Sequence, residues 1–172
     1  MAVFTIKAEN LRWIDESQDD PDDLCVHGDA EVHIGGYSAE YEKANVSAAA
    51  LMLLRMLEED HTLKDTVQLI PCCGHTWYAK ENGERCVMIG CPNGVDWTIQ
   101  HDGDDVIMTV PGHEDDPVRV PLAEYREEVF RFADQIEAYY HSCSPKTEPE
   151  DELGRTGWAA FRREWRRRRY GK

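Results

Sequence analysis

The chain has 172 residues, of which 41% are hydrophobic, 9% aromatic and 31% charged, and its formal net charge is −15. This composition excludes a disordered or fibrous chain and predicts one globular domain with a packed core. No apolar run reaches the roughly 20 residues that a transmembrane helix needs, and the N-terminus lacks the pattern of a secretory signal. We therefore expect a cytoplasmic protein with no membrane segment, whose six cysteines are reduced or bind metal.

The first part of the chain predicts two strands and a helix. Residues 2–8 and 26–34 alternate between apolar and polar side chains, which is the period of a half-buried strand. The acidic segment 15–23 between them predicts an exposed loop. Asn45 or Ser47 can cap a helix that continues through the alanine- and leucine-rich residues 48–60.

The second part predicts short strands followed by a long helix. Between residues 66 and 120, short β-prone segments flank two turn pairs, Asn82-Gly83 and Asp102-Gly103, which favour tight hairpins. Residues 122–141 carry apolar side chains at helical spacing. The order of these elements predicts an α+β fold: a mainly antiparallel sheet of about six strands packed by two helices, with a C-terminal amphipathic helix.

The C-terminal segment has a charge opposite to that of the rest of the chain. Residues 153–172 contain eight basic residues and one acidic residue, so they carry +7 and the other 152 residues carry −22. We predict one domain over residues 1–143, an acidic proline-containing linker over 144–154, and an arginine-rich helix over 155–172 that docks on the domain. The residues expected to make this interaction share one helical surface: Trp158, Phe161 and Trp165, with Arg162 and Arg166 beside them.

One group of residues has the chemistry of a zinc site. Zinc takes four tetrahedral sulfur or nitrogen ligands, and the group that could supply them comprises Cys72, Cys73, His75, Cys86 and Cys91. The paired Cys-x-x-Cys knuckles of zinc ribbons are absent, so we favour buried, reduced cysteines that pack as small apolar residues. Cys73 beside His75 could also act as a nucleophile, but no third residue that would orient the base is evident. Apart from zinc, no cofactor is expected.

Three segments carry a resemblance to a known family. Residues 90–97 (GCPNGVDW), 124–140 (EYREEVFRFADQIEAYY) and 149–169 (PEDELGRTGWAAFRREWRRRR) resemble those of small acidic hypothetical proteins from Gram-positive gut bacteria, a family with no assigned activity. The resemblance implies family membership and no catalytic residues. In size and charge the chain is also similar to the small acidic immunity proteins that neutralise bacterial toxins.

These observations lead to a ranked set of functional hypotheses. The sequence has no phosphate-binding glycine loop, no HExxH and no GxSxG. Residues 1–152, which we call the body, carry a charge of −22 that repels nucleic acid and attracts cations. We therefore expect a non-enzymatic, immunity-like or inhibitory protein that binds a basic protein partner. One alternative is a metal-dependent or thiol enzyme that uses the cysteine and histidine group. A second is a nucleic-acid-associated regulator that uses the arginine-rich helix.

Overall fold

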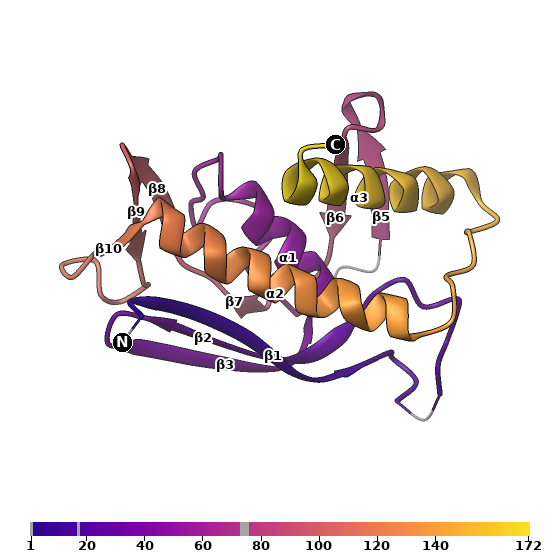
Figure 1. Ribbon diagram of the computed structural model, residues 1–172, viewed down its shortest axis with the longest axis horizontal. Coiled ribbons are helices and arrows are strands. Elements are labelled where there is room, and N and C mark those ends of the chain that lie inside the picture. The colour runs from indigo at the N-terminus through magenta and orange to yellow at the C-terminus, as the bar shows by residue number, and fades with distance from the viewer. Residues whose placement is uncertain (1, 17, 73–75) are drawn as a thin grey trace.

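The computed structural model describes residues 2–16, 18–72 and 76–172, and it confirms the α+β class (Figure 1). Within these residues, three helices and ten strands are joined by short turns and a few longer loops. In chain order they are β1 (Phe4–Arg12), β2 (His27–Ile34), β3 (Tyr37–Asn45), α1 (Val46–Arg55), β4 (Ile70–Pro71), β5 (Thr76–Lys80), the 3₁₀ turn η1 (Glu81–Gly83), β6 (Arg85–Ile89), β7 (Gly94–Val95), β8 (Thr98–Asp102), β9 (Asp105–Thr109), β10 (Val118–Pro121), α2 (Leu122–Ser142) and α3 (Glu152–Tyr170).

All strand pairs are antiparallel, as predicted, but the strands form several small sheets. The largest are β1-β2-β3 and β8-β9-β10, and β4-β7 and β5-β6 are two-stranded. The two predicted hairpins are confirmed: β5 pairs with β6 and β8 pairs with β9. Asn82 (φ 56°) and Gly103 (φ 62°) take the positive φ angles that these turns require. Strands β5 to β10 are only two to five residues long, and the hairpin β5-β6 packs against α3.

The three-stranded sheet β1-β2-β3 covers one side of α2 (Figure 1). The alternation in β1 and β2 turns Phe4, Ile6 and Val32 inward, where they are 0 to 2% exposed. Phe4 packs on Tyr125 of α2 with ring centroids 5.2 Å apart. The opposite face of the sheet carries the charged side chains and points away from the helices.

Helix α1 is the central element of the core. All ten of its residues are buried, and it contacts α2, α3 and β4. The Asn45 side chain accepts a hydrogen bond from the Ala48 N–H at 3.0 Å, which caps the helix as predicted from the sequence. A helix that is apolar on nearly every side fits this position, because each side meets another layer.

Helices α2 and α3 lie next to each other and run in opposite directions (Figure 1). The stripe predicted for α2 is buried at Tyr125, Val129, Phe132 and Ile136. Helix α3 begins at Glu152, with the Asp151 side chain accepting from the Gly154 N–H, so its first turn uses residues predicted as linker. Within the ranges given above, no helix is both long enough and apolar enough to cross a membrane.

Candidate functional site

An aromatic interface attaches α3 to the hairpin β5-β6. Trp158, Phe161 and Trp165 are 3 to 5% exposed, and Phe161 stacks on Trp77 of β5 with ring centroids 4.2 Å apart. At Gly157 the helix lies directly on the strand, because an added Cβ would be 2.0 Å from the Trp77 carbonyl oxygen. The helix therefore belongs to the core, and one edge of it is left to form a surface.

A buried ion pair joins α3 to α1. Glu164 is fully buried, and its carboxylate accepts from the Arg55 Nε and Nη2 at 2.8 Å and from the Cys86 N–H at 2.8 Å. Arg168 adds a fourth donor at 2.9 Å. Burial alone would raise the pKa of Glu164, but these hydrogen bonds and the Arg55 charge lower it, so the carboxylate stays ionised. This network fixes α3 relative to α1 and β6.

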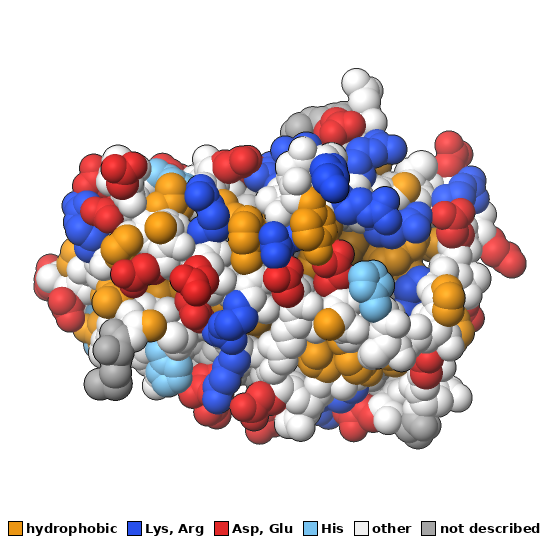
Figure 2. Space-filling view, viewed as in Figure 1, with side chains coloured by type: hydrophobic (Ala, Val, Ile, Leu, Met, Phe, Trp, Pro, Cys, Tyr) orange, Lys and Arg blue, Asp and Glu red, His pale blue; other side chains and the backbone are white. Residues whose placement is uncertain are grey.

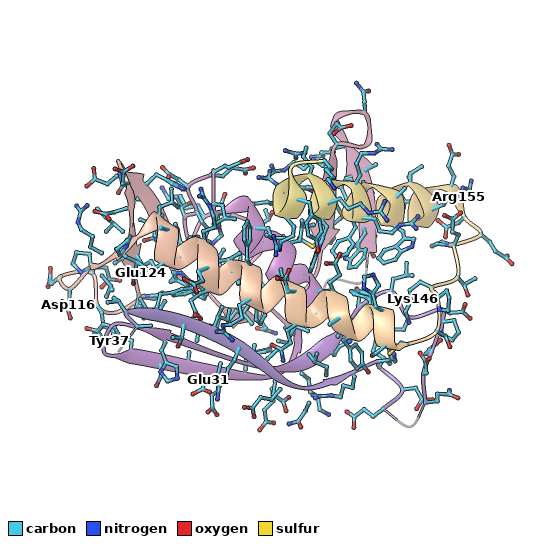
Figure 3. All side chains as sticks on the ribbon, in the orientation of Figure 1. Glu31, Tyr37, Asp116, Glu124, Lys146 and Arg155 are labelled. Atoms are coloured by element: carbon cyan, nitrogen blue, oxygen red, sulfur yellow. The ribbon has the colours of Figure 1, made fainter. Side chains whose placement is uncertain are left out.

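A groove of about 280 Å³ lies between the C-terminal half of α2 and α3. Figure 2 shows apolar side chains recessed below a row of Lys and Arg side chains in this region. Its apolar lining comes from Tyr140 of α2 and from the aromatic residues of α3. Lys146, on the segment that joins the two helices, lines one end (Figure 3). Beyond the other end, Arg169 of α3 bonds Asp134 of α2 at 2.6 Å, which bridges the helices.

The charged residues around this groove are mostly cationic. Arg162, Arg166 and Lys146 line it together with His141, and Glu137 is the one carboxylate in the lining. Arg162 bonds Glu148 at 3.1 Å, and Lys146 donates to the Asp20 carbonyl oxygen at 2.6 Å. Arg166 is exposed and makes no hydrogen bond or ion pair with any residue that the structure describes. Its charge is therefore available to a ligand in the groove.

The outward face of β1-β2-β3 is a second candidate surface, and it is acidic. A shallow depression of about 200 Å³ lies on it, and its acidic lining residues are Glu9, Asp29, Glu31, Glu40 and Glu42. Figure 3 shows Glu31 on the side of the sheet that points away from α2.

Two cations neutralise part of this acidic face. Lys7 pairs with Glu31 at 2.5 Å and Arg12 pairs with Asp29 at 2.9 Å. The hydrogen bond from Arg12, helped by one from Asn10, lowers the pKa of Asp29 to about 2. Glu40 and Glu42, both on β3, have no hydrogen-bond or ion-pair partner for their carboxylates within the described chain.

No protein-family model, curated protein or solved structure matches this chain. The resemblance of residues 90–97, 124–140 and 149–169 to small acidic hypothetical proteins therefore stays a prediction.

The predicted zinc group is only partly described. Cys73 and His75 lie outside the described residues. The Cys72 N–H donates to the Asn93 carbonyl at 3.0 Å, which places Cys72 beside the turn that carries Cys91. Cys86 is fully buried in β6, and burial raises the pKa of its thiol to about 12. Across residues 2–16, 18–72 and 76–172, no three Cys, His, Asp or Glu side chains form a group that could hold a metal ion.

One wall of the groove consists of residues predicted from the sequence to attach α3 to the domain, and the other wall was not predicted. The residues expected to make that attachment all line the groove: Trp158, Phe161, Trp165, Arg162 and Arg166. The other wall comes from α2 and the connecting segment, and its residues are Glu137, Tyr140, His141, Pro145 and Lys146. No local signal marks these residues, because they form a wall only where α2 and α3 come together.

Proposed function

We propose that this protein is a non-enzymatic binding protein that recognises a basic protein partner through the outer face of β1-β2-β3. The observation that carries the proposal is the pair of unpartnered carboxylates, Glu40 and Glu42, on a regular strand of that face. An immunity-like or inhibitory protein has this chemistry, because it covers a basic surface of its target with fixed carboxylates.

Electrostatics supports a role of this face in both the rate and the specificity of binding. Carboxylates of one sign raise the encounter rate with an oppositely charged protein, and they oppose nucleic acid and other acidic surfaces. A three-stranded sheet also holds these side chains at fixed spacings, so less order is lost on binding than with a flexible acidic loop. Arginines of a partner could bind Glu40 and Glu42 without displacing an existing ion pair.

Paired variants with equal charge changes test the proposal. E40Q/E42Q removes two charges from the acidic face, whereas E124Q/E127Q removes two exposed charges from α2, outside that face. Each tagged protein is used to capture partners from a lysate of the source cells at about 0.05, 0.15 and 0.5 M salt, where the screening length falls from roughly 14 to 4 Å. We expect one basic protein to be captured by the wild type and by E124Q/E127Q and to be lost, or weakened about tenfold, with E40Q/E42Q.

Several outcomes of this capture experiment would contradict the proposal. Equal losses in the two double variants would mean that net charge alone attracts the partner. Capture that does not change with salt, or capture of acidic proteins only, would exclude the acidic face as the binding surface.

A further inference from the structure

The groove between α2 and α3 has a charge opposite to that of the protein as a whole. The chain carries −15, yet Arg162, Arg166 and Lys146 line this one groove with a single carboxylate, Glu137. Glu137 also accepts a hydrogen bond from the Tyr170 hydroxyl. Of the two arginines that line the groove, Arg162 bonds Glu148 at 3.1 Å, whereas Arg166 bonds no carboxylate among the described residues.

We infer that this groove binds a small organic anion with a flat apolar body, such as an aromatic carboxylate or a nucleoside monophosphate. The apolar body would lie along the lining formed by Tyr140 and the aromatic residues of α3, and the anionic group would accept from Arg166. Arg162 would be a second donor through the N–H groups that its hydrogen bond to Glu148 does not use, since its guanidinium lies 5.2 Å from the centre of the Trp158 ring at the same groove. This arrangement is the usual one for small-molecule sites, in which a few polar groups orient a ligand on an apolar lining.

The dimensions of the groove limit the size of the ligand. A volume of about 280 Å³ is near the lower end of ligand pockets, which run from roughly 300 to 1,000 Å³. A cavity of about 150 Å³ holds benzene, so a bicyclic ring with a short acidic side chain fits this groove. A folded protein domain does not, and this separates the site from the acidic sheet face.

The preference for an anionic ligand follows from which cations at the groove already have a partner. Lys146 is held by the Asp20 carbonyl oxygen and lies 3.2 Å from the centre of the Trp13 ring, so it shapes the end of the groove. Arg166 has no such partner within the part of the chain that the structure describes. A cationic ligand of the same shape would meet Arg166 without a counter-ion, and we expect it to bind more weakly.

Binding of 1-naphthylacetate to the 172-residue chain tests the inference, with 1-naphthylmethylamine as the cationic analogue and AMP as the phosphate probe. Calorimetry gives the affinities, and the NMR shifts of the Trp158 and Trp165 indole N–H groups report the location. A ligand of this size with ordinary efficiency binds with a Kd of about 1 mM. We expect the naphthylacetate anion to bind at least about fivefold more tightly than the amine, and R166Q to weaken it about five- to tenfold.

R167Q is the matched control, because Arg167 is also exposed, carries the same charge and does not line the groove. We expect R167Q to leave the affinity unchanged within about twofold. Tighter, Arg166-dependent binding of AMP would support the inference and identify the anionic group as a phosphate. Equal binding of the amine, equal effects of R166Q and R167Q, or no binding of either anion would overturn it. The result does not depend on the acidic sheet face, so the two proposals can fail separately.

Discussion

Replacing Gly157 with alanine tests whether α3 is a structural part of the core. In an exposed helix this change stabilises by about 1 kcal/mol, because alanine is the better helix former. Here the new Cβ would lie 2.0 Å from the Trp77 carbonyl oxygen and 2.9 Å from the Tyr78 nitrogen, whereas ordinary contacts begin near 3.4 Å. Both contacts are with backbone atoms of β5, so α3 or β5 has to move by more than about 1 Å.

The loss in the free energy of unfolding can be estimated from the packing that this movement disturbs. Overpacking a core costs about 1–3 kcal/mol, and a backbone contact belongs at the upper end of that range. The shift also separates Phe161 from Trp77, whose ring centroids are 4.2 Å apart. After subtraction of the gain in helix propensity, we expect Gly157→Ala to lower the free energy of unfolding by about 2 kcal/mol.

Urea unfolding followed by tryptophan fluorescence measures this loss, because Trp77 and two tryptophans of α3 lie in the interface. Gly36→Ala is the matched control, since an added Cβ there meets nothing within 4 Å. We expect the control to stay within about 0.5 kcal/mol of the wild type. A Gly157→Ala protein as stable as the wild type, or more stable, would refute the close packing of α3 on β5.

Three further predictions concern buried or paired side chains. Glu164→Leu leaves the Arg55 guanidinium buried without its carboxylate, so we expect it to cost about 3–5 kcal/mol in urea unfolding and R55M/E164L to recover much of that loss. Burial opposes ionisation of Glu59, but the hydrogen bonds of Arg85 and the nearby arginine charges hold its pKa at about 2. Because that value is below the ordinary 4.5, the stability that this carboxylate contributes is present above pH 4.5 and is lost as the pH falls toward 2; unfolding measured across that range should show a smaller decline in Glu59→Gln. Cys86, with its pKa raised to about 12, should be alkylated by iodoacetamide only in urea, as peptide mass spectrometry can show, and labelling in the native state would contradict its burial.

The apolar periodicity of the sequence correctly predicted the elements that pack one face on the core. The stripe of α2 and the inward face of β2 are buried as expected, because one side of each packs on the core. Strand β3 (Tyr37–Asn45) was not predicted, although its first six residues alternate between apolar and polar side chains. Its inward side chains include alanine and tyrosine but no valine, isoleucine or leucine, so its inward face is less apolar than that of β2.

Arg55 and Glu164 each stand out in the sequence, but the sequence does not show that they form a pair. Arg55 is the single charge within the apolar run of α1, and Glu164 is the single acid within residues 153–172. Each is an exception in its own segment, and buried charges need partners. However, 109 residues separate them, so only the packing of α3 on α1 pairs the two.

The docked position of α3 also changes how a nucleic-acid role for the arginine-rich helix has to be tested. Deleting residues 155–172 would remove the partner of Arg55 and expose the Trp77 ring that Phe161 covers, so a loss of binding could reflect partial unfolding. Arg168 and Arg169 already pair with carboxylates of the body, so they are less available to phosphates than their exposed neighbours. Arg155, Arg166 and Arg167 pair with no acid among the residues described; Arg155 donates to the Glu150 carbonyl oxygen, and the side chains of Arg166 and Arg167 have no such partner. An electrophoretic shift of equal size in R166Q and R167Q would indicate a diffuse phosphate contact along the helix, whereas an effect confined to R166Q would indicate a ligand in the groove.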